Sequence, residues 1–232
     1  GATDTQPPVV RLDPRAEFPP VLNMAPSLNA VSVSREPFSD LIRVRLRRPL
    51  RDSEPGETSL AVYDPARWAA AVLKGMLDDA GVDVEGESRV STRPVDIDVA
   101  ATHQSPPLSE ILPLFNKPSE NAIGELLLHH LALHAGQEPA TWREGSNAIG
   151  EWLTKSVGLQ PDAFRLVDGS GLSRYNLITP HGTARLLAHM WKHPNRVTFV
   201  QSLPIAGIDD GGGTLSGRMR GTPAQGRVFA KT

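Results

Sequence analysis

Cysteine is absent from all 232 residues of this chain. Its absence excludes disulfides and thiolate metal sites. It fits an oxidising compartment without proving one, because many cytosolic proteins also lack cysteine. No run of about 18 apolar residues occurs, so the sequence predicts no membrane-spanning helix. The net charge of −2 provides no basic field for nucleic acid, and we expect no nucleic-acid partner.

Composition divides the chain into two expected parts, residues 1–60 and 61–232. The first part is rich in proline and β-branched residues, and residues 41–46 alternate apolar and basic side chains like a strand with one buried face. The basic residues of this region could bind an anionic polymer, but we favour a solvated strand face balanced by neighbouring acids. These residues are Arg43, Arg45, Arg47, Arg48 and Arg51.

Helices and strands are both expected beyond residue 60. Five helices are predicted: one from Asp64-Pro65 to Gly81, one from Ser105-Pro106 that Pro113 should kink or end early, one from Asn121 to about Ala135, and two capped by Thr141 and Thr179. Strands are predicted at 82–84, 95–99, 164–167 and 227–232. This grouping of helices and strands predicts an α+β fold.

The polar stretch Asn116–Asn121 connects two of the predicted helices. It places the Ser119 hydroxyl and the Asn121 carboxamide two residues apart, beside Lys117. Taken alone, Ser119 could be an ordinary helix N-cap, and Lys117 could make a surface salt bridge or a hydrogen bond that fixes the loop. A functional interpretation of this stretch therefore depends on residues far along the chain.

Two later stretches support a functional interpretation: the turn Asp168–Arg174 and the pair Lys231-Thr232. Together with Ser119-x-Asn121, they resemble the class C low-molecular-mass penicillin-binding proteins, which form a D-alanyl-D-alanine carboxypeptidase/endopeptidase family. The resemblance covers roughly residues 60–232. It implies the α+β fold of penicillin-binding proteins and serine β-lactamases, an antiparallel sheet with helices. Residues 1–60 would then be the remnant of a β-rich accessory domain, and residues 61–232 the C-terminal part of the catalytic domain.

The resemblance also implies roles for single residues. Ser119 would relay a proton between a lysine and the leaving amine, and Asn121 would donate a hydrogen bond to the substrate carbonyl or to that lysine. Lys231 would keep the site electropositive, and Thr232 would face a substrate that ends in a free carboxylate. Four further residues would support the site structurally: Lys117, Asp168, Ser170 and Arg174.

One part of the expected machinery is missing from the sequence. The family uses a Ser-x-x-Lys turn, which supplies the nucleophile and its lysine. None of the five lysines, at positions 74, 117, 155, 192 and 231, has a serine or threonine three residues before it. The glycine of the third motif is also absent, because Thr232 is the last residue. We therefore expect this chain to be a portion of a larger protein that does not acylate by itself.

The function that the resemblance implies is a serine-type D-alanyl-D-alanine carboxypeptidase/endopeptidase. It would act on peptidoglycan peptides outside the cytoplasm, in the periplasm or cell envelope, through an acyl-enzyme that β-lactams trap. Two alternatives stay open: a non-catalytic peptidoglycan-binding homologue, and a related serine esterase or β-lactamase. No cofactor is expected. His130 and His134 are spaced to bind zinc, but no third ligand is in view, so we expect no metal.

Overall fold

The computed structural model describes residues 11–24, 32–45, 59–89, 91, 98–99 and 101–232. The chain forms two compact units, Gly1–Val99 and Ala100–Thr232. The predicted boundary lies after residue 60, so the helix that follows this boundary belongs to the first unit. The assignment of the units to an accessory and a catalytic domain stays a prediction. None of the described helices is long and apolar enough to cross a membrane.

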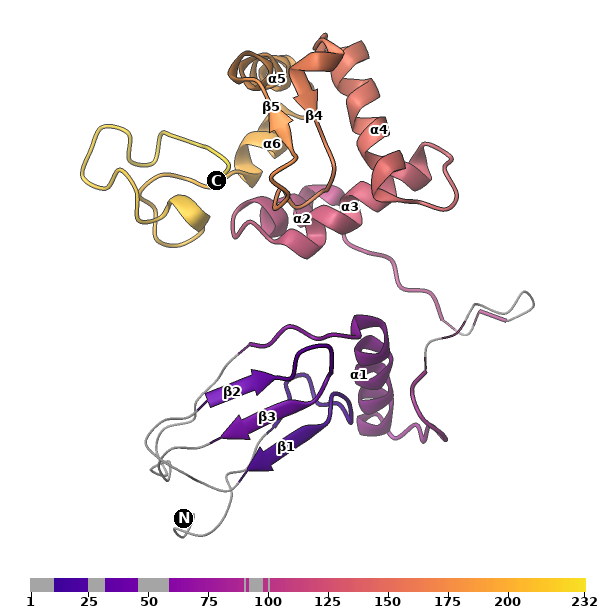
Figure 1. The fold of residues 1–232 in the computed structure, drawn as a ribbon. Coiled ribbons are helices and arrows are strands. Elements are labelled where there is room, and N and C mark those ends of the chain that lie inside the picture. Colours follow the sequence, from indigo (N-terminus) through magenta and orange to yellow (C-terminus); the bar gives the residue numbers. More distant parts are fainter. Residues whose placement is uncertain (1–10, 25–31, 46–58, 90, 92–97, 100) are drawn as a thin grey trace. The chain divides into compact units, whose positions relative to one another are not determined.

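The first unit holds a three-stranded sheet formed by β1 (Val21–Met24), β2 (Ser32–Arg35) and β3 (Ile42–Arg45) (Figure 1). The central strand β3 is parallel to β1 and antiparallel to β2. Ile42 and Val44 are buried, and Arg43 between them forms an ion pair with Glu36. The predicted alternation is therefore confirmed, and Arg43 is balanced by an acid. Arg47, Arg48 and Arg51 lie outside the described residues.

Helix α1 (Pro65–Asp79) begins as predicted. The Asp64 side chain accepts a hydrogen bond from the Arg67 N–H at 3.0 Å, and Pro65 occupies the first helical position, where its missing N–H is no loss. The strand predicted at 82–84 is wrong, because no described strand pairs with these residues. The strand predicted at 95–99 lies largely outside the described residues.

The second unit consists of helices around a two-stranded sheet (Figure 1). Strands β4 (Phe164–Arg165) and β5 (Leu177–Ile178) pair antiparallel, with Phe164 opposite Ile178. The helices, in chain order, are α2 (Leu108–Asn116), α3 (Asn121–His134), α4 (Trp142–Trp152), a π-helical turn (Leu153–Val157), a 3₁₀ turn (Pro161–Ala163), α5 (Pro180–Lys192), α6 (Arg196–Ser202) and a 3₁₀ turn (Gly213–Leu215).

Helices α3 and α4 pack closely because Gly145 lies at their contact. A Cβ atom at this position would lie 2.3 Å from the Leu128 carbonyl oxygen, so only glycine allows the approach. Leu128 and Ala132, four residues apart on α3, are fully buried. A second cluster of apolar side chains joins the end of α4 to β4 and α5: Leu153, Val157, Leu159, Ile149, Phe164, Leu166 and Leu186. The close contact between α3 and α4 at Gly145 anchors α3, the helix that follows the polar stretch 116–121.

The predicted helix ends were partly right. The Thr141 side chain caps α4 and the Thr179 side chain caps α5, as expected. Helix α2 begins at Leu108 after Pro107, so the predicted cap at Ser105-Pro106 is wrong. Pro113 lies inside α2 and does not end it, since the helix continues to Asn116. A proline removes only one N–H from the hydrogen-bond pattern, and the N–H of Lys117 still donates to the Pro113 carbonyl at 3.1 Å.

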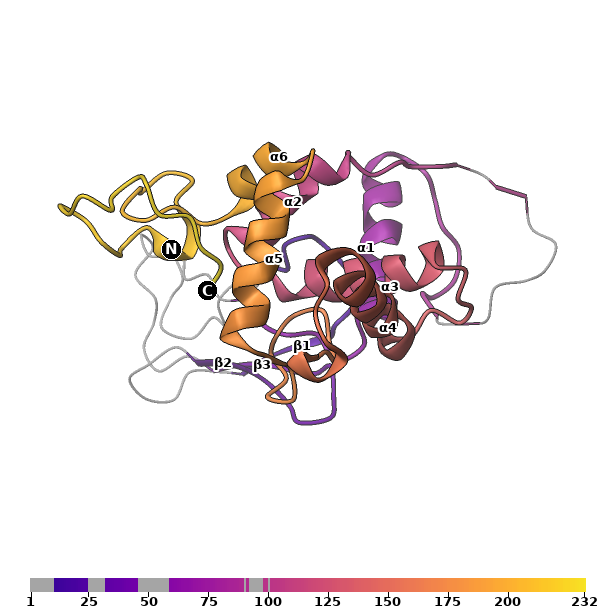
Figure 2. The ribbon, with the colours of Figure 1, turned by 90° about the horizontal axis from the view of Figure 1, so that it is seen from above.

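The strand predicted at 227–232 is wrong. Only an isolated antiparallel bridge joins Phe229 to Ile205, flanked by hydrogen bonds from Ala206 N to Val228 O (3.0 Å) and from Ala230 N to Pro204 O (3.1 Å). On one side of the bridge the partner backbone turns at Gly207, where φ is 70°. On the other side, a partner for Lys231 and Thr232 would have to come from residues 202–203, and Ser202 is the last residue of α6. In Figure 1 and Figure 2, the segment after α6 extends from the helices on the side opposite α4.

Candidate functional site

The polar stretch before α3 and the end of the chain meet in the structure. The Lys231 ammonium donates a hydrogen bond to the Ser119 hydroxyl at 2.5 Å, although 112 residues separate them. Both the Lys231 ammonium (2.5 Å) and the Ser119 hydroxyl (3.4 Å) also donate to the Thr232 carbonyl. Desolvation lowers the pKa of Lys231, because partial burial disfavours its charged form. Ser119 and Lys231, which belong to two distant motifs, are therefore joined in one hydrogen-bonded cluster with the Thr232 carbonyl.

Ser119 has an unusual backbone conformation, with φ at 63°. The left-handed region costs a residue with a Cβ atom about 1–2 kcal/mol, so the surroundings must hold it there. The next residue, Glu120, donates its N–H to the Phe115 carbonyl at 2.9 Å and caps α3 with its side chain. The N-cap of α3 is therefore Glu120, and the alternative that Ser119 caps this helix is wrong. Because the Ser119 hydroxyl does not cap the helix, it is available for the hydrogen bond from Lys231.

Lys117 joins the polar stretch to the segment that follows α6. Its ammonium donates to the carbonyl oxygens of Leu203 (3.3 Å) and Gly211 (2.8 Å). Its own carbonyl accepts a hydrogen bond from the Thr214 N–H at 3.0 Å. The preceding residue, Asn116, donates to the Ser202 hydroxyl at 2.8 Å. These contacts support the hypothesis that Lys117 fixes a loop, and no ion pair of Lys117 occurs with the residues that the structure describes.

Thr214 is a contact residue for which no role in the site was predicted. Its side-chain oxygen accepts a hydrogen bond from the Thr232 hydroxyl at 2.6 Å, while its N–H donates to Lys117. The neighbouring Gly213 is needed for this approach, since a Cβ there would lie 2.3 Å from the Lys117 carbonyl oxygen. Thr214 thus connects the loop before α3 to the end of the chain. The stretch Gly213–Leu215 resembles the approach to the family's third motif, but no contact could be predicted for Thr214, because its partners lie far away in the sequence.

Asn121 occupies the first position of α3 with an exposed side chain. Among the described residues, no hydrogen bond joins it to Ser119 or Lys231. It lies two residues after Ser119 along the chain. An exposed carboxamide at this point can donate to and accept from a bound molecule.

The Asp168–Arg174 turn is held in shape by one side chain. The Asp168 carboxylate accepts hydrogen bonds from the N–H groups of Gly171 (2.7 Å) and Ser173 (2.8 Å), and from the Asn176 carboxamide (2.7 Å). Each of its oxygens is therefore used inside the turn. The structural role expected of Asp168 stays a prediction, and these contacts support it. Arg174, by contrast, is exposed at the end of the turn.

Two glycines bring this turn onto α3. A Cβ at Gly124 would lie 2.5 Å from the Gly169 carbonyl oxygen, and a Cβ at Gly169 would lie 2.2 Å from the Gly124 carbonyl oxygen. The two backbones are therefore in direct contact. Figure 1 shows the loop between β4 and β5 reaching α3. Gly169 belongs to the turn that the sequence marked, without a predicted contact to α3. Gly124 was not singled out, because a glycine at a packing contact has no pattern that distinguishes it from other glycines.

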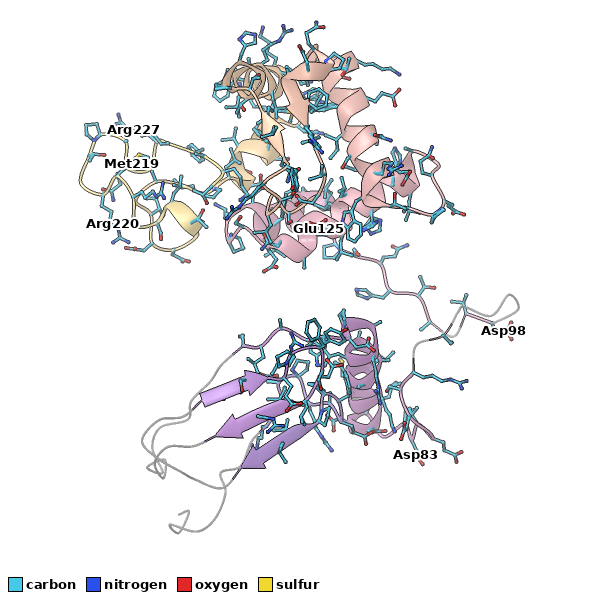
Figure 3. All side chains as sticks on the ribbon, viewed as in Figure 1. Asp83, Asp98, Glu125, Met219, Arg220 and Arg227 are labelled. Atoms are coloured by element: carbon cyan, nitrogen blue, oxygen red, sulfur yellow. The ribbon has the colours of Figure 1, made fainter. Side chains whose placement is uncertain are left out.

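Glu125, also on α3, accepts hydrogen bonds from the same turn. Its carboxylate accepts from the N–H groups of Gly169 (3.1 Å) and Ser170 (3.1 Å), and from the indole N–H of Trp142 (2.8 Å). Figure 3 labels Glu125 on α3, where the loop meets the helix. Burial raises the pKa of Glu125, but hydrogen bonds from Ser170, Gly169 and Trp142 outweigh burial and lower the pKa overall.

The lowered pKa of Glu125 predicts a pH-dependent contribution to stability. The folded state holds the carboxylate ionised to a lower pH than the unfolded state does, so the contribution is complete above the unfolded pKa, about 4.3. It is lost as the pH falls through the lowered folded pKa. We expect Glu125→Gln to reduce the free energy of unfolding at pH 7, with a gap that narrows as the pH falls below about 4. Denaturant unfolding at several pH values measures the gap, and an equal gap at every pH would contradict the prediction.

His130 and His134 lie on α3 with exposed side chains. Within the described ranges, no group of three histidine, cysteine, aspartate or glutamate side chains is placed to hold a metal ion. The contacts around Ser119 consist of hydroxyl, ammonium and carbonyl groups. This set suits proton transfer and hydrogen bonding to a substrate.

Comparison with known proteins gives consistent matches. Residues 48–232 match the D-Ala-D-Ala carboxypeptidase 3 (S13) family. A D-alanyl-D-alanine carboxypeptidase of Actinomadura sp. (strain R39) is 38% identical over 229 residues, which are 95% of this chain and 41% of that protein. The D-alanyl-D-alanine carboxypeptidase DacB of Haemophilus influenzae is 32% identical over 184 residues, which are 78% of this chain and 38% of that protein.

Solved structures give the same result. The crystal structure of penicillin binding protein 4 (dacB) from Haemophilus influenzae matches with a TM-score of 0.71 and 30% identity, over 91% of this chain and 47% of that one. The same protein complexed with a β-lactam matches with a TM-score of 0.70 and 28% identity, over 92% of this chain and 50% of that one. The predicted α+β fold is thus confirmed. The chain spans about two-fifths of the length of the two sequence relatives and about half of the solved chains.

Proposed function

The chain belongs to the D-Ala-D-Ala carboxypeptidase 3 (S13) family, and from this premise we propose that it is a portion of a serine-type D-alanyl-D-alanine carboxypeptidase/endopeptidase, with residues 61–232 in the catalytic domain. The substrates would be peptidoglycan peptides, and β-lactams would trap the acyl-enzyme. This chemistry would put the protein outside the cytoplasm, in the periplasm or cell envelope. The observation that carries the proposal is the hydrogen bond between Lys231 and Ser119.

The proposed reaction assigns Ser119 to proton transfer and not to nucleophilic attack. A serine outside these residues attacks the carbonyl carbon of the penultimate D-alanine, and its proton passes to the lysine of its own Ser-x-x-Lys turn. As the peptide C–N bond breaks, a proton moves through the Ser119 hydroxyl to the leaving amine of the last residue. Water then hydrolyses the acyl-enzyme ester. The contacts of Ser119 support this role, because its hydroxyl already lies within reach of an ammonium.

Lys231, Asn121 and Thr232 would hold the substrate. The ammonium of Lys231 attracts the free carboxylate of the peptide and disfavours protonation of the nearby lysine, because like charges repel. The exposed Asn121 carboxamide would donate to the substrate carbonyl, and the Thr232 hydroxyl would contact the carboxylate. The support roles proposed for Lys117, Asp168, Ser170 and Arg174 place the loop and turn around these groups. Lys117 already makes the contacts that such a role requires.

Labelling with a fluorescent penicillin tests the proposal. The full-length protein, with its upstream segment, is expected to form a covalent adduct that survives denaturation. The 232 residues alone are expected to form none, because no lysine here follows a serine at the required spacing. An upstream sequence without Ser-x-x-Lys, together with unlabelled full-length protein, would instead favour a non-catalytic peptidoglycan-binding homologue. Hydrolysis of penicillin faster than of D-alanyl-D-alanine peptides would favour a β-lactamase.

A further inference from the structure

Asn121, Gly124 and Glu125 share one face of α3. Residues three and four apart on an α-helix are surface neighbours, so the turn that contacts Gly124 and Glu125 follows the same face as Asn121. The distance along the helix is about one turn, roughly 5.4 Å. The Asp168–Arg174 turn is therefore seated immediately beyond the residue proposed to bind the substrate carbonyl.

Different groups determine the shape and the place of this turn. Among the described residues, Asp168 accepts hydrogen bonds only from the turn and from Asn176, which follows it, so Asp168 sets the shape of the turn. Glu125 lies on α3, and its carboxylate accepts hydrogen bonds from the N–H groups of Gly169 and Ser170. These two bonds, with the contact between Gly124 and Gly169, set where the turn lies on α3.

A carboxylate is required at Glu125 by the chemistry of its partners. Three donors converge on it: two backbone N–H groups and the Trp142 indole N–H. A carboxylate offers two oxygens that only accept, whereas a glutamine would turn an NH₂ group toward one of these donors. The hydrogen bonds that keep Glu125 ionised at neutral pH thus also tie the turn to the start of α4, where Trp142 lies.

We propose that Glu125 is a positioning residue, which holds the 168–174 turn beside Asn121 as one wall of the substrate-binding cleft. The inference rests on the proposed function and adds to it a residue that acts through the turn. Glu125 itself touches no reacting atom. Glu125 affects substrate binding indirectly, because it determines the position of Ser170 and of the residues after it.

This role predicts a characteristic kinetic change. A displaced cleft wall weakens substrate binding, so KM rises while proton transfer by Ser119 is preserved. A mere loss of folded protein would do the opposite, because it lowers the apparent kcat and leaves KM unchanged. The ratio of the two changes therefore separates positioning from general structural support.

The test uses the full-length protein with Glu125→Gln and the matched control Glu151→Gln. Glu151 is an exposed glutamate of α4 that pairs with Lys155 in the next turn. We expect Glu125→Gln to raise KM for a D-alanyl-D-alanine peptide so that kcat/KM falls about 10- to 100-fold, with kcat within about threefold of wild type. The same variant should speed hydrogen exchange at the amides of Gly169 and Ser170. Glu151→Gln should change neither quantity.

Amide exchange and KM test different parts of the proposal. Unchanged amide exchange in Glu125→Gln would show that this residue does not hold the turn. Faster exchange with an unchanged KM would show that the turn is not a wall of the cleft. If the wild-type full-length protein neither cleaves peptide nor binds penicillin, the proposed function fails and the kinetic role fails with it. The exchange result then still decides whether Glu125 holds the turn.

Discussion

Ser119→Ala is expected to lower the rate of D-alanyl-D-alanine peptide cleavage in the full-length protein by about 10²- to 10⁴-fold, the usual contribution of a positioned acid–base group. The Ser119 hydroxyl is the partner of the Lys231 ammonium, and alanine leaves no atom to relay a proton to the leaving amine. The loss should appear in kcat with little change in KM, since the hydroxyl acts mainly in the transition state. Acylation by a fluorescent penicillin should slow as well.

Ser156→Ala provides the control. Ser156 is an exposed serine of the π-helical turn after α4, within the same unit. Its substitution should leave both cleavage and acylation within about twofold of wild type, as is usual for surface positions. Wild-type acylation kinetics in Ser119→Ala would contradict the proton-relay role. A rise in KM alone would mean that Ser119 binds substrate without moving a proton.

Gly169→Ala is expected to reduce the free energy of unfolding by about 1–3 kcal/mol, the usual cost of overpacking. The added methyl group would lie 2.2 Å from the Gly124 carbonyl oxygen, a backbone atom that cannot rotate away. The turn must then leave α3 and lose the hydrogen bonds to Glu125. We therefore expect a raised KM for the peptide, in the same direction as for Glu125→Gln. Denaturant unfolding and steady-state kinetics measure the two effects.

A double-mutant cycle with Gly124→Ala sharpens this prediction. Each methyl group separates the same two backbones, so the double variant should lose less stability than the sum of the single ones. Gly217→Ala is the matched control, because a Cβ at Gly217 meets no atom within 4 Å. Its effect should stay within about 0.5 kcal/mol. Additive losses for Gly124 and Gly169 would mean that the two glycines do not serve one contact.

The local structure around the site could largely be predicted from the sequence. The caps Asp64, Thr141 and Thr179 and the start of α3 at Asn121 were predicted correctly, because a helix start depends on a few consecutive side chains. Strands were predicted less well. The segment 227–232 has the composition of a strand, but its pairing depends on what residues 204–206 do. The backbone opposite residues 231–232 belongs to the end of α6, so one isolated bridge is what forms in the described part of the chain.

The sequence by itself determined the order of the three polar stretches, hence the family, and the absence of a Ser-x-x-Lys pair among these residues. Such patterns are local, because chemistry needs particular residue types at short spacings. Only the tertiary structure decided that the Lys231 ammonium meets the Ser119 hydroxyl, and that Glu125 and two glycines hold the Asp168 turn. These contacts join residues 44 or more positions apart, as between Glu125 and Gly169. These contacts depend on helix packing and on the close approach of two backbones, and neither produces a periodic pattern in the sequence.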